Sequence, residues 1–117
     1  MSLSISKEIA RIIYEKKGEE ILILNLEKKS PIARFFIICT ATSPIHAQAI
    51  SDSIEEELSK KNHFPHHIEG YEKGSWILLD YLDIIVHIFI PEARSFYGLE
   101  RLWGDAPRVE FNVKEKD

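Results

Sequence analysis

The segment WILLDYLDIIVHIF (residues 76–89) decides the fold, because it predicts two strands joined by a tight turn. We expect strands over residues 75–81 and 84–90, with Leu82 and Asp83 as a two-residue loop. Successive side chains of a strand point to opposite faces, so this register sorts the hairpin into two sides. One side is almost entirely apolar and is predicted to face the core: Ile77, Leu79, Tyr81, Ile84, Val86 and Ile88.

The other side of the hairpin mixes aromatic and titratable groups: Trp76, Leu78 and Asp80 opposite Phe89, His87 and Ile85. In this register Asp80 and His87 are diagonal neighbours within reach of each other. A carboxylate beside a histidine orients the ring and raises its pKa. The pair would suit catalysis, a pH switch or structural pairing under the helix that follows, and we favour the structural role.

The rest of the chain completes an α/β pattern. Before the hairpin we predict helices over residues 4–17, ending at Gly18, and 43–61, and strands over residues 20–26, 34–40 and 66–70. The strand at 34–40 is nearly continuously apolar, as expected of a strand covered on both faces. The order of elements predicts an α/β (α+β) fold, a single domain whose mixed β-sheet of about five strands has flanking helices.

The helix over residues 43–61 has the clearest local signals. Ser43 can cap its N-terminus, and Pro44 stands at the first helical position, where an N–H is not needed. Glu56 and Lys60 are spaced for an i,i+4 pair on the outside. The buried stripe is predicted to be Ala47, Ile50, Ile54 and Leu58.

The segment PEARSFYGLERLW (residues 91–103) predicts a last helix that carries a binding surface. Gly98 costs about 1 kcal/mol inside a helix, so it either permits close backbone approach or breaks the helix there. Tyrosine and arginine are enriched at protein-binding hot spots, and Tyr97, Arg94 and Arg101 lie off the apolar stripe. That stripe is predicted to pack in the core: Phe96, Leu99, Leu102 and Trp103.

The composition is that of a globular protein from a reducing compartment. Hydrophobic residues make up 44% and charged residues 29% of the chain, which excludes a disordered polymer. Cys39 is the only cysteine, so no intramolecular disulfide can form. Because no apolar run approaches the roughly 18–20 residues that span a bilayer, and no targeting peptide is evident, we expect a cytoplasmic protein. The formal net charge of −4 argues against a nucleic-acid binder.

Two further kinds of binding site, a metal site and an RNA-binding site, are considered from the histidines and aromatic residues of the middle segment. His63, His66 and His67 could be metal ligands, but adjacent histidines of a strand point to opposite faces, so we interpret them as solvated loop residues. Phe64 and Tyr71 could stack on RNA bases, but the acidic charge weighs against that role. We therefore predict no metal site and no cofactor.

Four motifs together resemble the ribosomal silencing factor family, also called RsfS, iojap-like or YbeB. They are EG (69–70), WILLDY (76–81), DIIVHIF (83–89) and RSFYGLERLW (94–103), and the first half adds FFII (35–38) and QAISDSI (48–54). The resemblance covers about residues 4–106, and it defines a domain over residues 1–106 with a C-terminal tail over 107–117.

The resemblance implies a function. Family members resemble nucleotidyltransferases in fold but are not known as enzymes. They bind the large ribosomal subunit at its universal L-fourteen protein and sterically block subunit joining, which represses translation under nutrient limitation. It also implies a homodimer when free and, at most, minor rRNA contact. The predicted contact residues are Trp76, Asp80, Tyr81, His87, Phe89, Glu92, Arg94, Tyr97, Glu100 and Arg101.

The chain departs from the family pattern at three places. Leu82 stands where the family usually has glycine in the hairpin turn, so a positive φ there would cost roughly 1–2 kcal/mol. Arg34 stands where the family usually has an aspartate, before the aromatic residue of the strand at 34–40, and Ala41 or Thr42 stands where the family has a glycine before the serine that starts the helix. A transferase needs a Gly-Ser phosphate loop and two carboxylates that hold Mg²⁺ from one side. TATS (40–43) has no glycine, and Asp80 and Asp83 would point apart, so we predict a protein without enzymatic activity.

Overall fold

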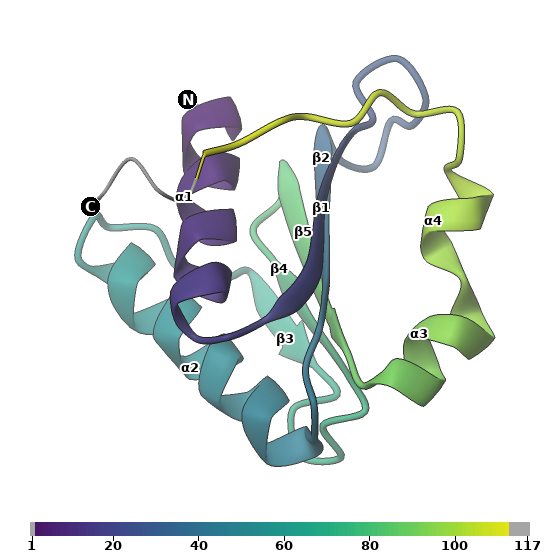
Figure 1. Ribbon diagram of the computed structural model, residues 1–117. Helices are drawn as coiled ribbons and strands as arrows, with labels where there is room; N and C mark the ends of the chain where they lie inside the picture. The colour runs from purple at the N-terminus through teal and green to yellow at the C-terminus, as the bar shows by residue number, and fades with distance from the viewer. Residues whose placement is uncertain (1, 113–117) are drawn as a thin grey trace.

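The computed structural model describes residues 2–112 and shows a five-stranded sheet with helices on both faces (Figure 1). Along the chain the elements are α1 (Ser2–Glu15), β1 (Glu19–Asn25), β2 (Phe35–Thr40), α2 (Pro44–Ser59), β3 (His67–Glu69), β4 (Trp76–Asp80), β5 (Ile84–Phe89), α3 (Pro91–Tyr97) and α4 (Leu99–Leu102). The strand order is β1-β2-β5-β4-β3, with β2 and β5 parallel and the other pairs antiparallel. The predicted fold class, a mixed sheet in a single domain, is confirmed.

The central hairpin has the predicted register. Ile77 pairs with Ile88, Leu79 with Val86, and Trp76 with Phe89. The Tyr81 N–H donates to the Ile84 carbonyl at 2.9 Å, which closes the turn around Leu82 and Asp83. The two faces of the hairpin therefore separate as the alternation predicts.

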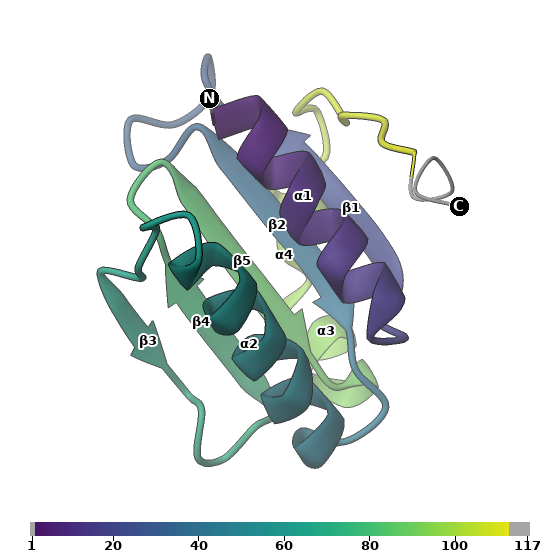
Figure 2. The same cartoon turned by 90° about the vertical axis from the view of Figure 1, so that its left-hand side faces the viewer.

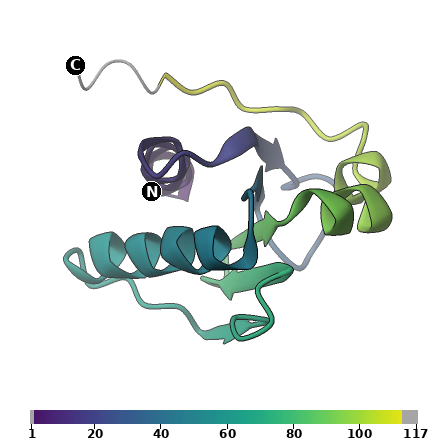
Figure 3. The ribbon, with the colours of Figure 1, turned by 60° about the horizontal axis from the view of Figure 1, so that its bottom comes forward.

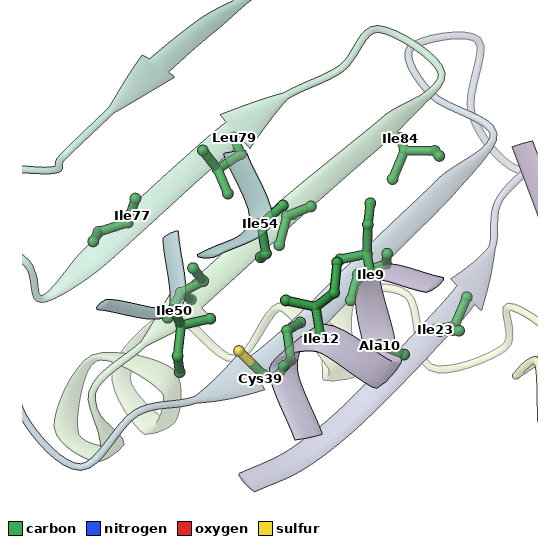
Figure 4. Close-up of a cluster of buried hydrophobic side chains, with 14 of the residues drawn as sticks. Ile9, Ala10, Ile12, Ile23, Cys39, Ile50, Ile54, Ile77, Leu79 and Ile84 are labelled. Atoms are coloured by element: carbon green, nitrogen blue, oxygen red, sulfur yellow. The ribbon is translucent and has the colours of Figure 1, made fainter. Parts of the chain in front are cut away.

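Each face of the sheet has its own apolar core. On one face, α1 and α2 lie side by side over the strands (Figure 2), and their isoleucines meet those of the sheet around Cys39 (Figure 4). On the other face lie α3 and α4 (Figures 1 and 3), over a second core that includes Leu24, Ile38 and Phe89. We call the core under α1 and α2 the main core. None of the helices in residues 2–112 is both long and apolar enough to cross a membrane.

The local signals at α2 act as predicted. The Ser43 side chain accepts a hydrogen bond from the His46 N–H at 3.1 Å, and Pro44 opens the helix. The predicted stripe of Ala47, Ile50, Ile54 and Leu58 is fully buried. The outer pair differs from the prediction, because Lys60 contacts Glu57 at 3.4 Å and not Glu56.

The end of α1 corrects the predicted role of Gly18. The left-handed residue after the helix is Lys17, with φ of 71°, and the Gly18 N–H donates to the Ile13 carbonyl at 2.8 Å. The Lys17 N–H donates to the Tyr14 carbonyl, so the two bonds form the helix-ending pattern usually built around a left-handed glycine. Gly18 is needed for space instead: a Cβ there would meet the Ile13 side chain at 2.3 Å.

The last predicted helix is broken in two at Gly98. This residue has φ of 56° and accepts the left-handed conformation that ends α3, and α4 begins directly after it. The break rotates the two halves, so the predicted core stripe is wrong in part. Phe96 is 80% exposed and Leu102 71% exposed, whereas Leu99 and Trp103 pack against the second core.

The segment after α4 lies along the outer edge of the sheet. The Asn25 N–H donates to the Pro107 carbonyl, and the Val109 N–H donates to the Ile23 carbonyl, each at 2.8 Å. Val109 and Phe111 pack against the main core. These contacts cover the edge of β1 and tie part of the predicted tail to the sheet, and the boundary at residue 106 stays a prediction.

The turn of the hairpin stores backbone strain at Leu82. Its φ is 73°, a left-handed conformation that a glycine adopts at little cost, and the side chain is 61% exposed. The left-handed conformation costs an L-residue with a Cβ about 1–2 kcal/mol, and little apolar burial offsets that cost here. The Asp80 carboxylate accepts a hydrogen bond from the Leu82 N–H at 2.8 Å and holds the turn in place.

We predict that Leu82→Gly raises the free energy of unfolding by about 0.5–1 kcal/mol, since relief of strain exceeds the entropy that glycine adds to the unfolded chain. Urea denaturation monitored by circular dichroism measures the change. Leu82→Ala is the matched control, because it removes the side chain but keeps the Cβ and the strain. Equal stability of the two variants would contradict the account.

Candidate protein-binding surface

An aromatic cluster fills the space between the sheet and α3. The Trp76 ring lies 5.0 Å from the Phe89 ring and 4.5 Å from the Tyr97 ring, measured between centroids. Phe89 is fully buried and Trp76 is partly exposed, whereas Tyr97 is 50% exposed. A rigid stack therefore leads from the core of the sheet to the surface, and Tyr97 is its outer member.

His87 belongs to this cluster and does not pair with Asp80 as predicted. Its Nδ1 accepts a hydrogen bond from Trp76 Nε1 at 3.1 Å, so the ring proton is on Nε2. The side chain is only 4% exposed, and among residues 2–112 its Nε2 has no hydrogen-bond partner. Burial lowers the pKa of His87 from 6.5 to about 4, opposite to the rise expected from a neighbouring carboxylate. The histidine is a neutral structural acceptor for Trp76.

Asp80 contacts the hairpin turn and the edge of the sheet near strand β3. Besides the Leu82 N–H, its carboxylate lies 3.7 Å from His67 Nδ1 on the neighbouring strand β3. The Asp80 carbonyl accepts from the His66 N–H at 2.6 Å. The predicted pairing of Asp80 with His87 is therefore wrong, and the carboxylate lies beside the hairpin turn and His67 instead.

The predicted contact residues differ in accessibility. Glu92, Tyr97 and Arg101 are exposed; Trp76, Asp80, Tyr81 and Glu100 are partly exposed; His87, Phe89 and Arg94 are buried. Tyr81 packs against the main core on the opposite face, where burial raises its pKa to about 12. Their contact with a partner stays a prediction, and the buried members can act only by holding exposed ones.

Two apolar residues join the accessible group although the sequence assigns them to the core. Phe96 and Leu102 stand largely in solvent on α3 and α4, and the Phe96 ring packs edge-on against Tyr97 with centroids 5.1 Å apart. The positive φ available to Gly98 was the signal that a continuous helical wheel would fail here. We call the accessible set the α3–α4 surface: Trp76, Glu92, Phe96, Tyr97, Arg101 and Leu102.

Elsewhere the structure brings together no metal-binding group of side chains in the part of the chain that it describes. No group of three or more histidine, cysteine or acidic side chains converges among residues 2–112. His67 contacts Glu69 at 3.0 Å, and Asp83 accepts from the Ser2 hydroxyl. Burial raises the pKa of the Cys39 thiol to about 12, which leaves it unreactive.

Comparison with known proteins gives one consistent family. A family model described as "Ribosomal silencing factor during starvation" matches residues 2–117. The chain is 41% identical over 98 residues to the ribosomal silencing factor RsfS of Halalkalibacterium halodurans, covering 84% of each chain. It is 37% identical over 109 residues to RsfS of Bacillus subtilis, covering 93% of this chain and 92% of that one.

The likeness extends to a plant organelle protein and to a solved structure. The chloroplastic protein Iojap of Zea mays is 38% identical over 109 residues, which cover 92% of this chain and 47% of that one. A crystal structure of a Chromobacterium violaceum protein superimposes with a TM-score of 0.85 at 30% identity, covering 95% of this chain and 92% of that one. Sequence and fold therefore point to the same relatives.

The His87–Trp76 bond predicts acid sensitivity. Because the pKa of His87 is lowered to about 4 in the folded state from an ordinary 6.5, its contribution to stability is complete above pH 6.5 and is lost as pH falls toward 4. A pKa difference of one unit between the folded and unfolded states corresponds to roughly 1.4 kcal/mol, so the free energy of unfolding should fall by about 3 kcal/mol between pH 7 and pH 4. His87→Gln keeps an acceptor for Trp76 but does not titrate. In urea denaturation between pH 7 and 4, its stability should fall less steeply than that of the wild type, and parallel curves would contradict this assignment.

Proposed function

The chain belongs to the ribosomal silencing factor family, and from that premise we propose that it binds the large ribosomal subunit at its universal L-fourteen protein and blocks subunit joining. The family consists of silencing factors and not of enzymes, as the sequence analysis predicts. Occupation of the face that meets the small subunit would prevent joining by steric exclusion alone. Translation would then fall when nutrients are scarce.

The α3–α4 surface supports the proposal as the site of contact. Tyr97 is half exposed and its ring is held against Trp76 at 4.5 Å, so little side-chain entropy is lost when a partner covers it. Aromatic anchors surrounded by charged side chains are the usual composition of a protein-binding hot spot. Glu92 and Arg101 supply exposed charges beside the rings. The single observation that carries the proposal is this preorganised, accessible Tyr97.

We also propose which partners the protein has and where in the cell it acts. The net charge of −4 favours a protein partner over rRNA, so rRNA contact is assigned a minor part. We include a homodimer for the free protein, as the family resemblance implies. The proposed site of action is the cytoplasm. Relatives are named as chloroplastic in Zea mays and as mitochondrial in Arabidopsis thaliana.

We predict that Tyr97→Ala weakens binding to isolated large subunits by more than about 1 kcal/mol, roughly fivefold in Kd, because it removes the exposed anchor. Co-sedimentation over a range of subunit concentrations measures the change. Tyr14→Ala is the matched control, since Tyr14 is 48% exposed on α1, on the other face of the sheet. A folded Tyr97→Ala protein that binds as well as the control would remove Tyr97 from the contact.

A further inference from the structure

Strand β1 contains a bulge whose strained residue faces the α3–α4 segment. The β1–β2 register shifts between Glu19 and Leu22, and Glu20 within this bulge has φ of 49°. A left-handed non-glycine residue is unfavourable unless its surroundings hold it there. The Glu20 carbonyl accepts a hydrogen bond from Arg94 Nη1 at 2.7 Å. The bulge thus presents a backbone acceptor to a residue of α3.

The guanidinium of Arg94 links its own helix, α3, to three other elements. Besides the Glu20 carbonyl on β1, Nη1 donates to the Thr40 hydroxyl on β2 at 2.8 Å, and Nε donates to the Glu100 carboxylate on α4 at 3.0 Å. The Arg94 side chain is only 8% exposed. A buried cation with three directed bonds fixes orientation, because each bond constrains a different direction of the planar group.

The α3–α4 segment has little fully buried surface of its own. Within α3 the one fully buried residue is Arg94, and α4 has no fully buried residue; the structure describes every residue of both helices. Ala93, Leu99 and Trp103 are partly buried against the second core, Tyr97 packs on Trp76, and Phe96 and Leu102 are largely exposed. No side chain caps the start of either helix. The apolar side chains of the segment are therefore at most partly buried, and the bonds of Arg94 add directed contacts with the sheet.

We propose that Arg94 is a positioning residue: seated on the β1 bulge, it holds the α3–α4 segment in the orientation that sets Tyr97 against Trp76. Arg94 does not contact the partner but orients the side chains that do. The inference deepens the proposed function and rests on it for its consequence in binding. The contact between Tyr97 and Trp76, however, is a property of the free protein and can be tested without the ribosome.

The geometry also predicts that lysine cannot substitute for Arg94. The three bonds use two different nitrogens of the guanidinium fork, which point toward the sheet and toward α4. An ammonium group is a single point at the end of a longer flexible stem, so it can reach one side of this arrangement but not hold both. Retention of charge alone should therefore not restore the orientation.

The test uses Trp76 as a reporter in the full-length protein. In a Trp103→Phe background Trp76 is the only tryptophan, so its emission and near-ultraviolet circular dichroism report the packing of Tyr97. Arg94→Met and Arg94→Lys are compared with the control Arg11→Met, which removes a partly exposed, ion-paired arginine from α1 on the other face. Binding to isolated large subunits is measured on the same variants without the Trp103 change.

The expected result is a red-shifted Trp76 emission and a loss of near-ultraviolet signal in both Arg94 variants, with unchanged far-ultraviolet circular dichroism and at least tenfold weaker subunit binding. Arg11→Met should match the parent in both readouts. A wild-type spectrum in folded Arg94→Met protein would overturn the proposal, as would rescue of both readouts by lysine. If the wild-type protein itself fails to bind large subunits, the proposed function is refuted while the spectra still decide the role of Arg94.

A milder variant covers the case in which the Arg94 variants do not fold. Thr40→Val removes one acceptor of the guanidinium while it keeps the shape of a side chain that is 4% exposed. The proposal expects a smaller shift of the same sign in Trp76 emission and a twofold to fivefold loss of binding. A folded Thr40→Val protein that is unchanged in both readouts would overturn it.

Discussion

Strand β5 is buried along its whole length, and this burial on both faces is the constraint on which the rest of the structure depends. A strand in the middle of the sheet with apolar groups on both sides requires a cover on each face. Helices α1 and α2 cover one face with a conventional apolar core. The other face is covered by α3, α4 and the aromatic cluster around Trp76. The exposed residues of the α3–α4 surface belong to this covering layer.

Local signals in the sequence predict most of the fold. The hairpin register follows from the period of two and a two-residue loop, and the start of α2 follows from Ser43 and Pro44, so both are confirmed to the residue. Leu82 has a positive φ at a turn where the family usually has glycine. What fails depends on contacts far apart in the chain. Two features depend on tertiary contacts that no local sequence pattern specifies. They are the hydrogen bond between His87 and Trp76 and the bulge at Glu20.

The sequence predicts a candidate surface within residues 76–103 but not which of its residues are exposed and which are buried. Residue type alone marks Phe89, His87 and Arg94 as contacts, because aromatic and arginine side chains are common at interfaces. Their burial makes them supports: Phe89 and His87 fix Trp76, and Arg94 fixes α3 and α4. The left-handed Gly98 turns Phe96 and Leu102 outward, so a helical wheel drawn through it assigns them to the wrong side.

A subunit-joining assay tests the proposal that the bound protein keeps the two ribosomal subunits apart. Large subunits are incubated with a molar excess of the protein, small subunits are added, and joined ribosomes are resolved on a sucrose gradient. We expect the protein to sediment with free large subunits and the peak of joined ribosomes to fall as the protein concentration rises. Joined ribosomes that form normally while the protein remains bound to the large subunit would contradict it.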